Sequence, residues 1–317
     1  MKAAVVREAG KPPVYGDFPD PSPAPGKSVI RVRASALSNL TRNRASGKHY
    51  SSNGVLPLIP GVDGVGTTSD GQRVFFIAPD SPYGGMAEYT LVDADHFFPI
   101  PDTLTDDVAA AMANPGMSSW AALVYRARLR SGETVLINGA TGSSGRLAIQ
   151  IAKHLGAGNV IATGRRAEAL DEARQLGADA TVLLTQEPPA LEAAFGDIFA
   201  RRVDVVLDYL WGTSAQTLIV AAAKAGPPGV PIRFVQIGSI SGGTITLPSA
   251  ALRSSSLELL GSGIGSVAFP DLLASIRGVL DAAPSAGFQT QTESMPLAEV
   301  ASAWAREDSD ARIVLHP

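Results

Sequence analysis

The stretch from Val135 to Gly145, VLINGATGSSG, constrains the fold more than any other part of this chain. It is typical of a buried strand, a tight glycine turn and the start of a helix. Gly139 and Gly142 are able to adopt positive φ and bring bare backbone close to a ligand, and Gly145 lets the helix pack tightly on the strand. The stretch therefore predicts a site where backbone N–H groups and the positive end of a helix hold a dinucleotide pyrophosphate.

The flanking residues support this interpretation. Ser143 and Ser144 come where hydroxyl groups cap a helix or contact phosphate, apolar residues then recur at helical spacing, and the run 159–163, NVIAT, is typical of a second parallel strand. A phosphate-binding loop of nucleotide triphosphatases needs Lys and then Ser or Thr after its last glycine, whereas Arg146 and Leu147 stand there. That class of site is excluded at this turn.

The end of the second strand indicates which dinucleotide is bound. An NAD site usually places Asp or Glu there to accept a hydrogen bond from the ribose 2′-hydroxyl, whereas a 2′-phosphate needs a cation. Gly164 is followed by Arg165 and Arg166, and no carboxylate intervenes before Glu168. Because a guanidinium group can hold phosphate through two hydrogen bonds, the sequence favours NADP over NAD.

Composition excludes several other classes. The net charge of −4 and a pI near 5.6 give no basic footprint for nucleic acid as the main role. No uncharged apolar run approaches the length of a membrane span and the N-terminus lacks a secretory signal, so we expect a cytoplasmic protein without a membrane role. The chain has no Cys and only four scattered His, so no metal site is expected.

The first hundred residues predict a twisted, largely antiparallel β domain. Strands are expected at 2–6, 28–33, within 61–77 and at 84–92, and the proline-rich connection 12–26 is expected to lack regular structure. Residues 106–130 have a helical pattern that Pro115-Gly116 divides into two segments. We place a domain boundary there.

The later sequence alternates between strands and helices and predicts a doubly wound parallel sheet. Strands are expected at 203–210, 232–238 and 257–266, helices at 214–225 and 272–282, and a terminal strand at ARIVL. Ligands of such sheets bind beyond the carboxyl ends of the strands. The residues expected at this crevice are Gly139, Arg165, Asp208, Tyr209, Gly238 and Ser239.

Several motifs in one order resemble the medium-chain dehydrogenase/reductase superfamily, in particular its zinc-independent quinone oxidoreductase-like branch. The resemblance covers essentially the whole chain and is carried by MKAAVV, LPLIPGVDGVG, GGMAEYTLV, NGATGSSG, LGAD, VQIGSISGG and LLGSGIGS. It implies an α/β fold in which a GroES-like β-rich catalytic domain is built from both chain ends, residues 1–117 and 259–317. A central Rossmann domain would span residues 118–258.

The resemblance also implies a reaction. Zinc-free relatives use NADPH to transfer hydride to a quinone or to the activated C=C bond of an α,β-unsaturated carbonyl, with no Lewis acid. Zinc-dependent relatives use cysteine ligands and a His-Glu pair where this chain has Gly61-Val62-Asp63. Asp63 is accordingly interpreted as a structural hydrogen-bonding residue.

Site residues are implied in the same way. The pyrophosphate would lie against the residues around the glycine turn, the 2′-phosphate against the residues that end the second strand, and the ribose and nicotinamide along two later loops. The resulting set is Gly139, Thr141, Gly142, Ser143, Ser144, Gly145, Gly164, Arg165, Arg166, Ile237, Gly238, Ser239, Ser262, Gly263 and Ile264.

The catalytic segment would be residues 36–50, in which Asn39 and Thr41 orient substrate or the nicotinamide ribose. Many relatives carry a tyrosine where this chain has Asn43, so this chain departs from the family pattern at the position of a tyrosine proton donor. Tyr50 or His49 are the alternatives in this segment.

Two other functions remain open. An enoyl-thioester reductase of the same superfamily would need a basic entrance, for which Arg42, Arg44 and Lys48 are candidates. A non-catalytic NADPH-binding or sensing protein would bind the cofactor without turnover. Short-chain dehydrogenases are excluded because their glycine turn lies at the N-terminus and no tyrosine here has lysine four positions on. Relatives commonly form homodimers through an edge strand of the cofactor domain, and residues 257–265 are the expected edge.

Overall fold

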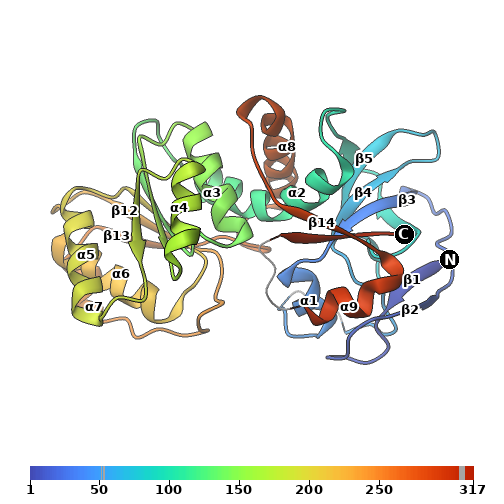
Figure 1. Ribbon diagram of the computed structural model, residues 1–317, viewed down its shortest axis with the longest axis horizontal. Helices are drawn as coiled ribbons and strands as arrows, with labels where there is room; N and C mark the ends of the chain where they lie inside the picture. The colour runs from blue at the N-terminus through green and yellow to red at the C-terminus, as the bar shows by residue number, and fades with distance from the viewer. Residues whose placement is uncertain (51, 53, 307–310) are drawn as a thin grey trace. The chain divides into compact units, whose positions relative to one another are not determined.

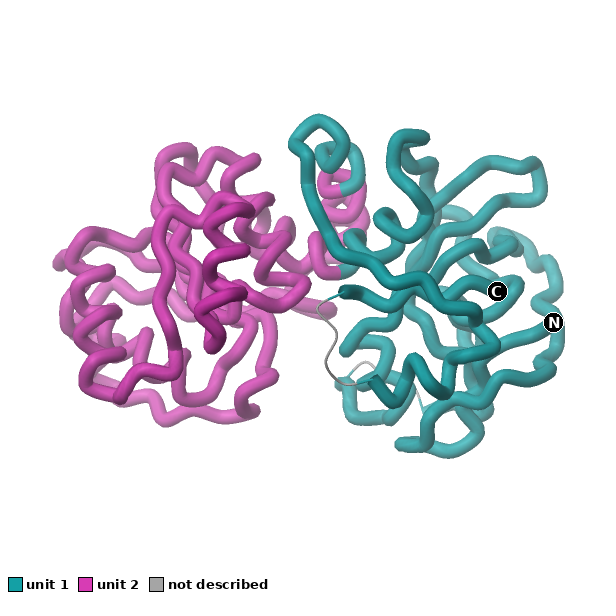
Figure 2. Tube along the Cα trace, in the orientation of Figure 1, with its two compact units in different colours: residues 1–114, 280–317 teal, residues 115–279 magenta. Residues whose placement is uncertain are grey.

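The computed structural model describes residues 1–50, 52, 54–306 and 311–317, and its chain divides into two compact units. One unit contains Met1–Asn114 and Leu280–Pro317, and the other contains Pro115–Val279 (Figure 2). The first unit therefore uses both ends of the chain, and each unit has its own sheet and core.

The first unit is β-rich and mainly antiparallel. Its large sheet has the order β14-β15-β3-β4-β5-β7, with β6 also paired to β3, and a small sheet pairs β1 with β2. The C-terminal strand β15 pairs with β3 through Val314 and Ala36, which joins the two chain ends. The strands are β1 (Lys2–Val5), β2 (Val14–Asp17), β3 (Lys27–Ala36), β4 (Asp63–Thr67), β5 (Arg73–Ile77), β6 (Tyr89–Asp93), β7 (Phe97–Pro99), β14 (Thr292–Pro296) and β15 (Arg312–His316).

Short helices accompany this sheet. They are α1 (Asn39–Ala45), the 3₁₀ turn η2 (Leu297–Glu299) and α9 (Val300–Ala305). A buried cluster joins residues from both chain ends, including Val5, Met86 and Val300. Burial of this apolar surface explains why segments so far apart in sequence form one unit.

The second unit is a doubly wound parallel sheet. Its order, β10-β9-β8-β11-β12-β13, is the 3-2-1-4-5-6 order of dinucleotide-binding sheets. The strands are β8 (Thr134–Asn138), β9 (Asn159–Gly164), β10 (Ala180–Leu183), β11 (Val205–Asp208), β12 (Ile232–Gln236) and β13 (Leu257–Gly261). The expected fold class, an α/β chain with a Rossmann-type sheet and a separate β-rich sheet, is confirmed.

Helices cover both faces of this sheet. Figure 1 shows α5, α6 and α7 on one side of it and α3 and α4 on the other. A buried cluster that includes Phe195, Phe199 and Phe234 lies beneath α5 and α6. The helices are α3 (Ser143–His154), α4 (Ala167–Gln175), α5 (Pro188–Ala200), α6 (Gly212–Ala225) and α7 (Ser249–Arg253).

The chain passes between the units within two helices, α2 (Asp106–Ala121) and α8 (Phe269–Ala286). Within the second unit these helices approach closely, because a Cβ at Gly116 would lie 2.7 Å from Val279 Cγ1 and a Cβ at Gly278 would lie 2.6 Å from Trp120 Cζ2. Glycine at these two positions therefore sets how near the helices pack.

Three local expectations were wrong. The connection 12–26 contains the strand β2, because its prolines flank the four residues that pair with β1. Pro115 does not divide the helix: α2 runs through it, and the π-helix η1 (Ala122–Arg126) follows directly. Residue 258 is no boundary, since β13 completes the parallel sheet and the unit continues to Val279.

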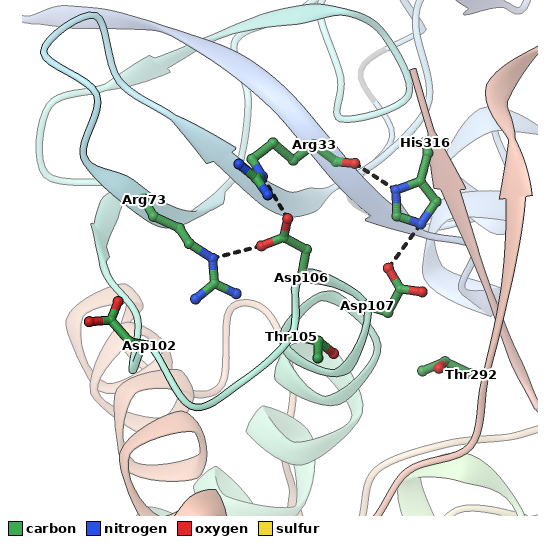
Figure 3. Close-up of a pocket in the computed structure, with 8 residues that line it drawn as sticks. All are labelled: Arg33, Arg73, Asp102, Thr105, Asp106, Asp107, Thr292 and His316. Carbon is green, nitrogen blue, oxygen red and sulfur yellow. Dashed lines mark hydrogen bonds and ion pairs between the residues drawn. The ribbon is translucent and has the colours of Figure 1, made fainter.

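An ion network fixes the start of α2 in the first unit. Asp106 accepts hydrogen bonds from Arg33 Nε at 2.6 Å and Arg73 Nε at 2.7 Å, and His316 Nε2 lies 2.9 Å from Asp107 Oδ1 (Figure 3). These residues border a cavity of about 610 Å³. Because both arginines already bind Asp106, we interpret the cavity as the surface of a structural network.

The Asp106 carboxylate makes a pH-dependent contribution to stability. Burial raises its pKa, but the hydrogen bonds and charges of Arg73 and Arg33 outweigh burial and hold the pKa below its ordinary value. A carboxyl group with a lowered pKa stabilises the folded state above the ordinary carboxyl range, about pH 4, and this stabilisation is lost as the pH falls through the lowered value.

We therefore expect Asp106→Asn to lower the free energy of unfolding at pH 7 by about 1–2 kcal/mol, the cost of weakening charge-assisted hydrogen bonds. The difference from the unmodified protein should narrow below about pH 4. Denaturant unfolding at pH 7 and pH 3 measures both effects. Asp102→Asn is the control, since Asp102 borders the same cavity but has no ion pair among the described residues. Equal losses in the two variants would contradict the assignment.

Candidate cofactor site and active site

The glycine turn joins β8 to α3 as expected. Gly139 has φ +88°, whereas Gly142 is the N-cap of α3 with an ordinary φ of −81°. A Cβ at Gly145 would lie 2.3 Å from Gly139 O, so only glycine allows the helix to begin this close to the turn. Positive φ is therefore needed at Gly139 and not at Gly142.

The start of α3 presents backbone donors. The first helical hydrogen bond runs from Arg146 N to Gly142 O at 2.8 Å, so the N–H groups of Ser143, Ser144 and Gly145 have no partner within the helix. Such N–H groups and the positive end of the helix dipole favour an anion. Thr141 precedes this group and its carbonyl accepts a hydrogen bond from Arg146 Nε at 3.2 Å.

A buried polar network lies beneath the turn, at the carboxyl ends of β8, β9 and β11. Asn138 donates from Nδ2 to Asp208 Oδ1 at 2.8 Å and accepts at Oδ1 from the Thr163 hydroxyl at 2.9 Å. The same Thr163 oxygen accepts from Gly139 N at 3.1 Å. All three side chains are fully buried. The network therefore ties the glycine turn to the two neighbouring strands.

Asp208 is the ionisable residue of this network. Burial raises its pKa, and hydrogen bonds from Asn138 Nδ2 and from the backbone N–H groups of Leu210 and Trp211 oppose the rise. Trp211 is held at φ +56°, a rare conformation for a large side chain, and its N–H lies 3.1 Å from Asp208 Oδ2. Asp208 therefore shapes the loop that follows β11.

The loops after β8 and β9 touch. A Cβ at Gly164 would lie 2.5 Å from Thr141 Cγ2, so glycine is needed at the end of β9. Arg165 and Arg166 follow and both are exposed. Arg165 makes no ion pair within the described ranges, whereas Arg146 is bound to Glu172 on α4. Arg165 is thus a cation beside the turn that is available to a ligand.

The loops after β12 and β13 continue the same edge of the sheet. Ile237 N and Gly238 N donate to Asp208 O at 2.8 and 3.1 Å, which brings this loop to the end of β11. Ser262 follows β13 and donates from its N–H to Gln236 O at 2.9 Å. The expected cofactor residues on these two loops, which also include Ser239, Gly263 and Ile264, therefore all follow carboxyl ends of the parallel strands.

The expected catalytic residues lie in the first unit, mostly on α1. Asn39 and Asn43 are exposed one helical turn apart, whereas Thr41 is buried and its hydroxyl lies 2.9 Å from the N-cap side chain of Ser38. Tyr50 lies outside the helix, is 72% exposed and stacks on His49 with ring centroids 4.2 Å apart. The structure groups the two asparagines and places Thr41 against the N-cap residue, Ser38.

Asp63 is a buried residue at the start of β4. Burial raises its pKa to about 7, and the charge of Arg312 and the neighbouring Asn114 oppose the rise. Arg312 is also buried, and burial lowers its pKa. Within the described ranges, no group of three or more His, Asp or Glu could hold a metal ion. Among the described residues, Asp63 Oδ2 has no hydrogen-bond partner, whereas the backbone oxygen of Asp63 accepts from the Ser35 hydroxyl at 2.8 Å.

Sequence reasoning missed three residues of the cofactor edge. Asn138 ends β8 and Thr163 comes one residue before the end of β9, and each is a polar residue in a buried run, a pattern that can be found in a sequence. Ser119 of α2 lies 3.1 Å from Ser144 O and 2.8 Å from the Tyr209 hydroxyl, and no local pattern connects it to the turn.

Comparison with known proteins identifies the family. A family model described as "Zinc-binding dehydrogenase" matches residues 145–278. The "Probable NADPH-dependent quinone reductase tdiC" of Emericella nidulans is 30% identical over an alignment of 361 residues that covers 100% of both chains. A phthioceranic/hydroxyphthioceranic acid synthase of Mycobacterium tuberculosis is 30% identical over 308 residues, which are 93% of this chain and 14% of that protein.

A solved structure supports the same assignment. The quinone oxidoreductase from Thermus thermophilus, described also in its complex with NADPH, has a TM-score of 0.83 and 27% identity over 100% of both chains. The chain therefore belongs to the medium-chain dehydrogenase/reductase superfamily and to its quinone oxidoreductase-like branch.

Proposed function

We propose that this protein is an NADPH-dependent oxidoreductase that transfers hydride to a quinone or to the activated C=C bond of an α,β-unsaturated carbonyl, without zinc. The proposal rests above all on the start of α3, where free backbone donors and an open glycine lie beside the exposed Arg165. The quinone reductase relatives support an oxidoreductase that uses NADP(H).

The chain would bind the pyrophosphate at the N–H groups of Ser143, Ser144 and Gly145. Gly142 lies at this helix start, and an added Cβ would meet nothing within 4 Å, so its small size is not required by the fold. We infer that the space belongs to the ligand. Thr141 and Gly139 shape the turn, and the loops at 237–239 and 262–264 would line the ribose and nicotinamide.

Arg165, with Arg166 beside it, would hold the 2′-phosphate. Both follow the strand next to the glycine turn, where a ribose 2′-substituent is read in this kind of sheet. The guanidinium group of Arg165 can form two charge-assisted hydrogen bonds with a phosphate.

In the first unit, Asn39 and Asn43 are the proposed polar contacts for the substrate carbonyl. They share one face of α1 at a spacing of one turn, so both amides could reach one small molecule. Thr41 would act indirectly by fixing the start of α1, and Tyr50 is the exposed candidate for a proton donor. NADPH, when bound, supplies the hydride, and these side chains would orient the acceptor.

Zinc does not suit the residues present. The chain has no Cys, and the position of the expected His-Glu pair reads Gly61-Val62-Asp63. Asp63 faces Arg312, a neighbour that would repel a cation. Hydride transfer to a carbon conjugated to a carbonyl can proceed with hydrogen-bond donors in place of a Lewis acid.

Enoyl-thioester reduction is the second candidate, supported by the match to a phthioceranic/hydroxyphthioceranic acid synthase. The basic entrance that it needs is weakened by the structure. Arg42 donates to the backbone carbonyls of Trp304 and Arg306, and its guanidinium lies 5.4 Å from the Trp304 ring centroid, so it caps α9. Arg44 is half-buried. Lys48 remains exposed.

A cytoplasmic homodimer is part of the proposal. The edge strand β13 has exposed apolar side chains, Leu259 at 37% and, in the loop after it, Ile264 at 39%. An unpaired apolar edge favours association with a second copy. In the described part of the chain, no helix combines the length and the apolar character needed to cross a membrane.

The first experiment is steady-state oxidation of NADPH and NADH by chelator-treated protein. The acceptors are a quinone, an α,β-unsaturated ketone, an enoyl thioester and a saturated aldehyde. We expect turnover with NADPH and the first two acceptors at a rate that the chelator does not change. Preference for the thioester would favour the second candidate, and aldehyde turnover or NADPH binding without turnover would reject the proposed reaction.

Arg165→Ala should separate the two nucleotides. We expect the Kd of NADPH to rise about 10- to 100-fold, because charge-assisted hydrogen bonds to the 2′-phosphate are lost, while the Kd of NADH changes little. Fluorescence titration measures both constants. Arg253→Ala, an exposed arginine of α7 in the same unit, is the control and should bind like the unmodified protein. An equal change for NADPH and NADH would contradict the role of Arg165.

Gly142→Ala should weaken NADPH binding without a matching loss of stability. Gly142 has an ordinary φ and open space at its Cβ position, but alanine is a poorer N-cap than glycine, so the unfolding midpoint should change little. The Kd of NADPH should rise about 10-fold or more, since the methyl group would occupy ligand space. Gly145→Ala is the contrasting variant and should destabilise the fold, because its Cβ would collide with Gly139 O. Unchanged NADPH binding by Gly142→Ala would place the pyrophosphate elsewhere.

A further inference from the structure

Tyr209 lies at the point where the strand order of the parallel sheet reverses. It follows β11, and its N–H donates to Asn138 O, at the end of β8, at 3.1 Å. The loop after β12 packs directly against the Tyr209 backbone, because a Cβ at Gly238 would lie 2.7 Å from Tyr209 O. Crevices for ligands of such sheets open at this reversal.

The phenol hydroxyl of Tyr209 is the inner end of a hydrogen-bond chain. It lies 2.8 Å from Ser119 Oγ, and Ser119 Oγ lies 3.1 Å from Ser144 O and 3.1 Å from Pro115 O. Burial raises the pKa of Tyr209 well above its usual range, against the opposing influence of the neighbouring Ser119 and Ser118 hydroxyl groups, so the phenol keeps its proton.

The donor and acceptor roles in this hydrogen-bond chain follow from the number of hydroxyl protons. Ser119 has one hydroxyl proton, and the carbonyls of Ser144 and Pro115 only accept. The Ser119 proton is therefore directed at these carbonyls, and the Ser119 oxygen must accept from the Tyr209 hydroxyl. The hydrogen-bond chain runs from Tyr209 O–H to Ser119, whose single proton is shared by the carbonyls of Ser144 and Pro115.

The Ser144 carbonyl belongs to the same peptide plane as the Gly145 N–H. A trans peptide is rigid, so a hydrogen bond that orients the carbonyl also orients the N–H on its opposite side. That N–H is one of the three donors at the start of α3 that have no partner within the helix. Gly145 cannot be braced by a side chain of its own, because it must be glycine to fit.

We propose that Tyr209, acting through Ser119, is a positioning residue that holds the Gly145 N–H ready for the cofactor pyrophosphate. The proposal rests on the proposed function, because it assumes that a nicotinamide dinucleotide binds at this turn. Its consequence differs from that of Arg165. The pyrophosphate is common to NADPH and NADH, so loss of the hydrogen-bond chain must weaken the binding of both nucleotides by the same factor.

The test is the Kd of NADPH and of NADH for the full-length unmodified protein, Tyr209→Phe, Ser119→Ala and the double variant. Tyr209→Phe removes one oxygen atom and keeps the ring, so the fold should be retained. We expect a rise of about 3- to 10-fold for both nucleotides, typical of one lost neutral hydrogen bond. The double variant should be no weaker than the weaker single variant, since both substitutions break one chain.

Two further readouts exclude a general structural effect. The KM for NADPH should rise while kcat falls less than about twofold, because the chain orients a cofactor contact and touches no reacting atom. Tyr125→Phe makes the same chemical change in the same unit, at a residue with no hydrogen bond among those that the structure describes, and should bind both nucleotides like the unmodified protein.

The outcomes separate the two proposals. If the unmodified protein binds neither nucleotide, the proposed function fails and this inference fails with it. If the unmodified protein binds and Tyr209→Phe binds equally well, only the inference is overturned. A loss confined to NADPH, or additive losses in the double variant, would also overturn it.

Discussion

The buried hydrogen-bond network of Asn138, Thr163 and Asp208 is the constraint on which the candidate cofactor site depends. A buried polar group without a partner is costly, so each of these side chains restricts the others. Together they fix the carboxyl ends of three parallel strands, and the Thr163 oxygen accepts the N–H of Gly139. The glycine turn is thus held in place before any ligand arrives.

The three glycines of the turn have different physical roles. Gly139 supplies a positive φ. Gly145 lets the helix approach the turn closely, because a Cβ at this position would lie only 2.3 Å from Gly139 O. Gly142 does neither, which is why its size points to a ligand. The fold therefore requires glycine at two positions of this sequence motif, Gly139 and Gly145. It does not explain the glycine at the third position, Gly142.

Much of the fold could be predicted from local patterns. The strand at β9, the helix at α6 and the parallel sheet follow from apolar periodicity and turn residues, which act over a few neighbours. The errors arose where the structure of a segment depends on residues far away in the sequence. Residues 14–17 form a strand because β1 offers an edge, and β13 belongs to the cofactor unit because β12 pairs with it. Pro115 stays inside a helix whose neighbouring residues are largely buried.

The sequence by itself determined the glycine turn, the two arginines after β9 and the absence of cysteine, because each depends on residue type at a fixed local spacing. Only the tertiary structure decided that Arg42 binds the end of α9 and that Ser119 links Tyr209 to Ser144. These contacts join residues whose pairing depends on how helices and strands pack. No local pattern encodes such a partner, since a hydroxyl or guanidinium group can be satisfied in many ways and packing selects one.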